Sequence, residues 1–173
     1  AQLVEKCILA FELVARLREA GLDFVFKGGT CLLLHVQPIR RLSIDADIIT
    51  GATVAQISRI LDTIALRPPF QGYEYQERRE RENPPTRYFS LRYAPVTGAR
   101  RPEDHIQLDV TIDPNIHPAT EKKVLALDLF KPESEVRVDV PTVDGLLGDK
   151  LTAFAPSTVG VLYHPLPRRP GET

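Results

Sequence analysis

The chain has 173 residues, with 22 lysines and arginines against 23 aspartates and glutamates, so its formal net charge is −1. This balance excludes a strongly basic nucleic-acid coat, and the 43% hydrophobic and 26% charged residues exclude an intrinsically disordered chain. No apolar run approaches the ~20 residues that span a bilayer and no secretory signal pattern opens the sequence, so we expect a cytoplasmic protein without a membrane partner.

The length and the cysteine content indicate how the chain is organised. A chain of this size suits one compact domain, which we expect over residues 1–160. The proline-rich tail over 161–173 is expected to begin a linker toward a C-terminal helical part. Cys7 and Cys31 are too few for a disulfide framework or a four-thiolate zinc site, so we expect two buried thiols.

The first part of the chain alternates helical and extended patterns. Apolar residues recur at three- and four-residue steps over 3–20, which predicts an amphipathic helix. A short strand is predicted over 23–26. It runs into a glycine turn, and a short apolar helix is predicted behind that turn over 31–36.

A strand with a polar face is predicted next. Strict alternation over 43–49 puts the apolar residues on one face and Ser43, Asp45 and Asp47 on the other. One strand is therefore expected to present two carboxylates side by side. Helical spacing resumes over 53–66, with the threonine that opens this segment as the expected N-cap.

The second half of the sequence is mostly extended. Charges alternate over 73–82, which we expect to be a solvated edge or loop, and alternation over 105–113 predicts a strand whose polar face carries Asp109 and Asp113. Further strands are predicted over 87–93, 123–130 and 136–140, and a helix over 143–154. This order of elements predicts an α+β fold, in which one mixed sheet is flanked by helices.

The features that carry chemistry are the turn Gly28-Gly29-Thr30, the pair Asp45 and Asp47, and Asp109. Glycines at a helix start let a ligand approach free backbone N–H groups, which is typical of a phosphate cradle, although plain chain reversal also explains such a turn. Carboxylates crowded on one face repel each other unless a cation neutralises them, and hard divalent ions prefer such oxygen ligands. The four histidines are scattered, so no softer metal site competes.

These residues resemble the signature of a known family. Lys27-Gly28-Gly29-Thr30 and the run from Arg41 to Asp47 are similar to the K-G-G-T…R-x-S-x-D-x-D motif of AbiEii/AbiGii-type nucleotidyltransferases, a branch of the DNA polymerase β-like superfamily. Members of the family include toxins of type IV toxin–antitoxin and abortive-infection systems. The segment 149–153 is similar to the family's D-K-x-x-A helix motif, and the resemblance extends over residues 24–154.

The resemblance implies a nucleotidyltransferase-like mixed β-sheet flanked by helices, and an enzyme that transfers NMP from an NTP to an acceptor hydroxyl. It assigns nucleotide binding to Lys27, Gly28, Gly29, Thr30, Arg41 and Ser43. It assigns Mg²⁺ or Mn²⁺ to Asp45, Asp47 and Asp109, with Asp113 as a rival for the third place. The same three aspartates are the expected catalytic residues, together with Lys150.

A second region bears on the acceptor. Residues 83–102 contain no Asp or Glu, and their mixture of arginines and aromatic rings can hold a single-stranded RNA end, although a solvated strand fits equally well. The residues concerned are Arg87, Tyr88, Phe89, Arg92, Tyr93, Arg100 and Arg101. The resemblance favours RNA, in particular a tRNA 3′ end, and implies a cognate antitoxin as a partner. Two alternatives stay open: a small-molecule nucleotidyltransferase similar to aminoglycoside-modifying enzymes, and a truncated, non-catalytic binding module.

Overall fold

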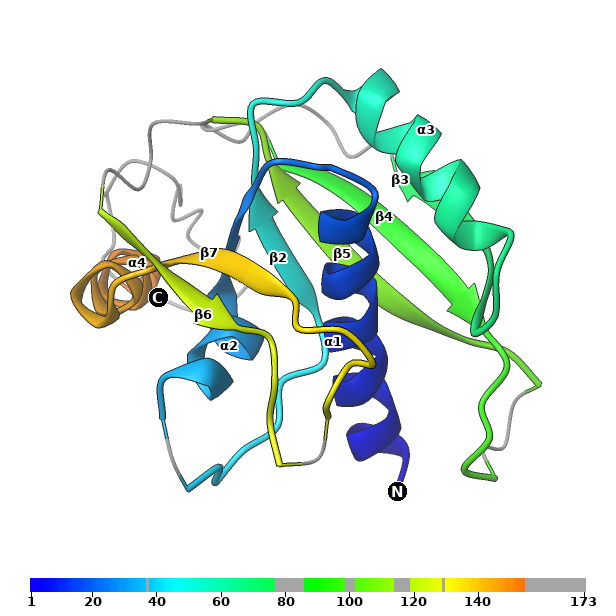
Figure 1. The fold of residues 1–173 in the computed structure, drawn as a ribbon, viewed down its shortest axis with the longest axis horizontal. Helices are drawn as coiled ribbons and strands as arrows, with labels where there is room; N and C mark the ends of the chain where they lie inside the picture. Colours follow the sequence, from blue (N-terminus) through cyan, green and yellow to red (C-terminus); the bar gives the residue numbers. More distant parts are fainter. Residues whose placement is uncertain (37, 77–85, 99–101, 114–118, 129, 155–173) are drawn as a thin grey trace, which may run out of the picture.

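Seven strands form one mixed sheet, in the order β3-β4-β5-β2-β1-β7-β6 (Figure 1). The structure is a computed structural model, and it describes residues 1–36, 38–76, 86–98, 102–113, 119–128 and 130–154. The helices are α1 (Gln2–Glu19), α2 (Gly28–Cys31), the 3₁₀ helix η1 (Leu32–Leu34), α3 (Val54–Ala65) and α4 (Val143–Phe154). The strands are β1 (Val25–Lys27), β2 (Ala46–Ile49), β3 (Phe70–Gln76), β4 (Thr86–Tyr93), β5 (Asp104–Thr111), β6 (Thr120–Val124) and β7 (Arg137–Pro141).

The hydrophobic core lies between one face of this sheet and the helices α1 and α3 (Figure 1). The apolar stripe of α1 packs on the central strands, where the Phe11 ring meets the Phe26 ring edge-on at 6.0 Å. Alternate residues of β5 are buried under the same helix, as the sequence predicts: Ile106, Leu108 and Val110. The intervening residues therefore point to the opposite face of the sheet.

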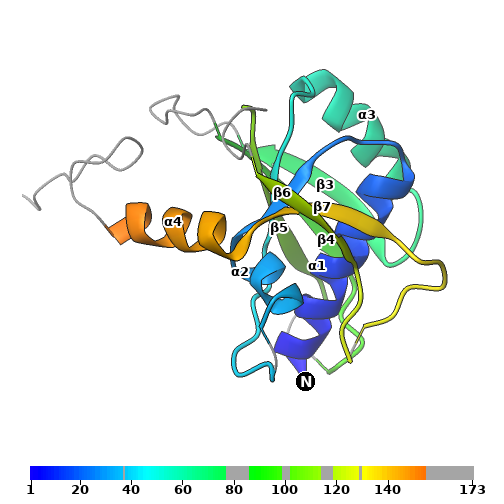
Figure 2. The same ribbon diagram turned by 60° about the vertical axis from the view of Figure 1, so that its left-hand side comes forward.

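The structure confirms the helices predicted from the period of the apolar residues. The cap of α3 is a capping box, in which the Gln56 amide donates to the Thr53 hydroxyl at 3.3 Å and the Thr53 amide donates to the Gln56 side chain at 2.8 Å. Helix α4 begins and ends where the sequence predicts, and it projects away from the sheet (Figure 2). Both cysteines are buried free thiols, as expected. Among the described residues, no helix is both long and apolar enough to cross a membrane.

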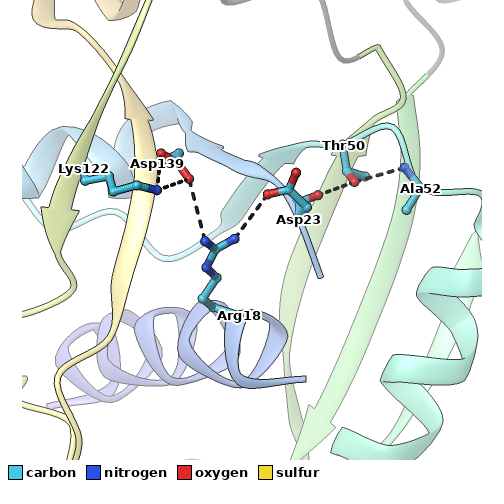
Figure 3. A network of polar contacts seen from close by, with 6 residues as sticks. All are labelled: Arg18, Asp23, Thr50, Ala52, Lys122 and Asp139. Carbon is cyan, nitrogen blue, oxygen red and sulfur yellow. Dashed lines mark hydrogen bonds and ion pairs between the residues drawn. The ribbon is translucent and has the colours of Figure 1, made fainter. Parts of the chain in front are cut away.

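A polar network fastens the end of α1 to the sheet (Figure 3). The Arg18 guanidinium lies 3.2 Å from the Asp23 carboxylate and 3.9 Å from that of Asp139 on β7. Lys122 on β6 donates to the Asp139 carboxylate at 2.8 Å, and the Thr50 hydroxyl donates to the Asp23 carbonyl at 2.7 Å. These contacts link the outer strands β6 and β7 to the C-terminal end of α1 and to the segment that precedes β1.

Two strand predictions are wrong at their boundaries. The strand expected from residue 43 begins only at Ala46, because the Asp45 carbonyl accepts a hydrogen bond from the Thr30 hydroxyl at 2.5 Å instead of pairing in the sheet. The strand expected over 123–130 is β6 at 120–124, after which the chain turns. The apolar side chains of Leu127 and Phe130 are buried within this turn, where the two residues form an isolated bridge.

The charged stretch predicted over 73–82 as a solvated edge or loop is confirmed in its described part, which forms the second half of the edge strand β3 beside β4. Residues 77–82 lie outside the described residues, as does the proline-rich tail expected over 161–173. The short helix expected over 31–36 starts earlier, at Gly28, and continues as η1.

The Phe11 side chain tests the packing of α1. Phe11 is fully buried against Phe26 and Phe130, so we expect Phe11→Ala to lower the free energy of unfolding by about 3–5 kcal/mol, through lost contacts and the cavity left behind. Leu3 on the same helix is 61% exposed, and Leu3→Ala should change it by less than about 0.5 kcal/mol. Urea unfolding measures both, and equal effects would contradict this packing.

Candidate active site

A row of polar side chains crosses the sheet on the face opposite the core. Strand pairing places Lys27 of β1 beside Asp47 of β2, and Asp47 beside Asp109 of β5. The same row continues through Tyr88 of β4 to Gln76 of β3. Residues paired in register share a face, so Asp47 and Asp109 stand side by side on neighbouring strands about 4.8 Å apart.

The glycine turn packs directly against this row. Gly28 follows Lys27 with φ +77°, in the left-handed region that favours glycine. A β-carbon at this position would overlap the Asp47 carboxylate and lie 2.9 Å from the Asp47 Cβ. A β-carbon on Gly29 would lie 2.8 Å from the Ser43 hydroxyl. The turn needs glycine because the segment that carries Ser43 and Asp47 approaches its backbone so closely.

Thr30 holds the turn to the segment before β2. Its side chain is fully buried and its hydroxyl donates to the Asp45 carbonyl at 2.5 Å. The resemblance assigns this hydroxyl to a phosphate, but in the structure its proton is committed to the backbone. Thr30 therefore holds Asp45 in position and does not present an exposed hydrogen-bond donor.

The electrostatics of Asp47 show which charges the fold gathers. Burial, followed by the charge of Asp109, raises the pKa of the Asp47 carboxyl to about 6. Lys27 and Lys150 lower this pKa and Asp45 raises it further, so all four groups lie within electrostatic range of Asp47. The fold thus brings together residues that the sequence separates by more than one hundred positions.

Of the three predicted metal ligands, the structure places Asp47 and Asp109 side by side and leaves Asp45 outside the strand. Asp47 and Asp109 are adjacent, whereas Asp45 lies exposed ahead of β2 and acts less strongly on the Asp47 pKa than Asp109 does. Over the described ranges, no three Asp, Glu, His or Cys side chains are arranged to hold one metal ion. The donor chemistry of the pair still fits Mg²⁺, which takes one or two protein carboxylates and completes its shell with substrate phosphates and water.

The structure also places the remaining predicted site residues. Ser43 touches the glycine turn, Arg41 is exposed in the bend that precedes β2, and Lys150 is exposed on α4. Asp113 lies beyond the end of β5, so Asp109 and not its rival stands opposite Asp47.

Part of the RNA-binding prediction is wrong. Phe89 and Tyr93 are fully buried in the core, because they occupy the alternate positions of β4 that face α1 and α3, so neither ring can stack on a base. Tyr88 faces the polar side beside Asp109, and Arg92 is exposed. Arg100 and Arg101 lie outside the described residues.

Sequence reasoning missed Gln76 and Gln107 as members of the polar face around the two carboxylates. Alternation already puts Gln107 on the face of Asp109, but it does not say which strands are neighbours. The pairing of β3, β4 and β5 supplies that information, and it places Gln76 in the row of Asp47 and Gln107 one step along β5 from that row.

Comparison with known proteins identifies the family and the fold. Residues 12–168 match the family described as nucleotidyl transferase AbiEii toxin, type IV TA system. No curated protein matches the sequence. The structure is similar to a crystal structure from H. pylori assigned as a nucleotidyltransferase, with TM-score 0.53 and 16% identity over 86% of this chain and 56% of that one.

A second similar structure is that of JHP933 from Helicobacter pylori, with TM-score 0.53 and 17% identity over 86% of this chain and 55% of that one. At such identities the likeness concerns the fold. The chain matches little more than half the length of either protein.

Gly28 tests the close approach of the turn to Asp47. We expect Gly28→Ala to be more destabilising than Gly21→Ala by at least about 1 kcal/mol, because both glycines have φ near +80° but a β-carbon on Gly21 meets nothing within 4 Å. Gly21→Ala therefore measures the backbone strain alone. Chemical denaturation gives both values, and equal losses would contradict the contact between the turn and the carboxylate.

The pKa of Asp47 predicts how stability depends on pH. The folded-state pKa of about 6 lies above the reference value of 3.8, so folding favours the protonated carboxyl and stability falls as pH rises from about 4 to about 6. Asp47→Asn should therefore match the parent protein at pH 4 and exceed its free energy of unfolding by up to about 3 kcal/mol at pH 7.5, without divalent cations.

Unfolding at the two pH values checks this expectation. Asp128→Asn, at an exposed turn, is the control and should change both free energies by less than about 0.5 kcal/mol. A lower stability of Asp47→Asn at pH 7.5 would show that the carboxylate is not under electrostatic stress.

Proposed function

Because the chain belongs to the AbiEii nucleotidyl transferase toxin family of type IV toxin–antitoxin systems, we propose that it transfers NMP from an NTP to an acceptor hydroxyl. The observation that carries the proposal is the side-by-side placement of Asp47 and Asp109 against the Gly28 turn. Such a reaction needs anionic groups to hold a divalent cation, an open backbone for phosphate and cations for the leaving group.

The residues of the chain would divide these tasks between the two sides of Asp47. The backbone N–H groups of Gly28 and Gly29 at the start of α2 would bind the triphosphate, and Lys27 would neutralise part of its charge. Lys150 approaches the same carboxylates from α4 and would act on the leaving pyrophosphate. Ser43, which touches the turn, and Arg41, two residues before it in the sequence, would complete the nucleotide site.

The carboxylates would hold Mg²⁺ or Mn²⁺, with Asp47 and Asp109 as the main ligands and Asp45 joining them. When bound, the cation would neutralise the negative charge that develops on the phosphoryl oxygens. In the transfer, the acceptor oxygen forms a bond to the α-phosphorus while the bond from that phosphorus to the bridging oxygen breaks, and pyrophosphate leaves. Asp109 would accept the proton of the attacking hydroxyl.

RNA is the proposed acceptor, in particular a tRNA 3′ end, and the reaction would take place in the cytoplasm. Tyr88 supports this choice, because strand pairing puts its ring beside Asp109 on the polar face, where a terminal base could stack. The exposed Arg92 lies on the same face of β4 and could meet the RNA backbone. A cognate antitoxin would be the protein partner, as the name of the family implies.

Transfer of labelled nucleotide tests the proposal. In Mg²⁺ with total tRNA, Asp47→Asn and Asp109→Asn should each lower transfer by about 10²-fold or more, because each removes a charge that the transition state requires. Asp113→Asn is the matched control beyond the end of β5 and should stay within about twofold.

The same assay separates the alternatives. Transfer to an aminoglycoside panel instead of RNA would favour the small-molecule enzyme, and absence of Mg²⁺-dependent NTP binding by calorimetry would favour a non-catalytic binding module. Normal transfer by Asp47→Asn would refute the proposed metal assignment.

A further inference from the structure

Gln107 places a buried amide next to the proposed active site. It lies on β5 two residues before Asp109, so both side chains point to the polar face of the sheet. Its neighbour Leu108 pairs with Ala46, which puts Gln107 level with the segment that carries Asp45. Within the described part of the chain, its Nε2 atom is buried and has no hydrogen-bond partner.

A buried amide donor without a partner is unusual in a folded protein. Nearly all buried polar groups are hydrogen-bonded, because leaving one unsatisfied costs its desolvation energy. The opposite neighbour in β4 is Ser90, which is itself almost fully buried. An apolar side chain would fill this position without that cost, so the amide is suited to an oxygen that arrives with a ligand.

The order of the strands indicates which substrate brings that oxygen. The glycine turn follows β1, whereas Gln107 stands on β5, two strand spacings or about 10 Å away across β2. If the triphosphate occupies the turn, the side of Asp109 that faces β4 is left for the acceptor. Tyr88 lies on that side, and Gln107 lies next to Asp109 along β5, where it borders the path that the acceptor would take.

We propose that Gln107 is an acceptor-binding residue, whose Nε2–H donates to a ribose or phosphate oxygen of the terminal nucleotide of the RNA. This inference rests on the proposed function, because it uses the same site and the same acceptor class. It adds a residue that binds the acceptor RNA and does not contribute to NTP binding. The hydrogen bond would hold the terminal nucleotide beside Asp109.

Gln107→Met tests the proposal, because methionine keeps the length of the side chain and removes the donor. We expect the KM for tRNA to rise about tenfold, with kcat changed by less than about threefold and the Kd for Mg²⁺-NTP unchanged. Tm should be equal or higher, since an unsatisfied amide has been removed from the free protein. The control Gln71→Met, at an exposed position of β3, should change none of these quantities.

The contrary outcomes are distinct. A lower Tm with an unchanged KM would show that the amide serves the fold, and a weaker Kd for NTP would place it in the nucleotide site. Either result overturns the proposal.

Binding of a fluorescent single-stranded oligoribonucleotide with the tRNA acceptor-end sequence, measured by anisotropy, separates this inference from the proposed function. If the parent protein binds this RNA but transfers nothing to it, the proposed function fails. A loss of affinity in Gln107→Met alone would still support the role of Gln107. If the parent protein does not bind the RNA, or both glutamine variants bind it equally well, the inference is overturned.

Discussion

The parallel pairing of β2 with β5 forces two carboxylates to stand side by side, and much of the surrounding structure answers that constraint. Asp47 and Asp109 are held in register, and burial with mutual repulsion raises the pKa of Asp47. The turn at Gly28 closes on Asp47 because no β-carbon intervenes, and lysines from β1 and α4 bring compensating charge. A site under such stress is typical of function, because stability alone would not select it.

The core on the other face of the sheet is what keeps this register in place. Ile48 and Leu108 alternate with the two aspartates and are fully buried under α1. A slip of one residue in either strand would expose these aliphatic side chains and bury the carboxylates, which costs several kcal/mol per group. The packing of Phe11 in the core and the register of the two carboxylates therefore depend on each other.

The sequence was most informative where local signals agree with tertiary structure. Helical spacing predicts α1, α3 and α4, and alternation assigns the faces of β5, because each pattern reports burial directly. Strand pairing depends on contacts between distant segments, so the sequence does not place Gln107 beside the two carboxylates. Phe89 and Tyr93 belong to the core and not to an RNA-binding surface, because the face of β4 that they share is covered by the core. The motif residues predicted the neighbourhood of the site, whereas the structure supplied its layout, including the Thr30 hydrogen bond that takes Asp45 out of β2.

The packing of α4 against the rest of the protein determines how precisely Lys150 is positioned. Of the α4 side chains described, from Val143 to Leu151, Leu146 alone is buried, and the helix projects from the sheet beyond that one anchor (Figure 2). Lys150 stands about 10 Å along the axis from the first residue of the helix. A tilt of about 10° at the first turn of the helix would displace this ammonium group by about 2 Å, because the displacement grows with distance along the axis. The position of the Lys150 ammonium group therefore depends on how well the single buried Leu146 packs against the rest of the protein.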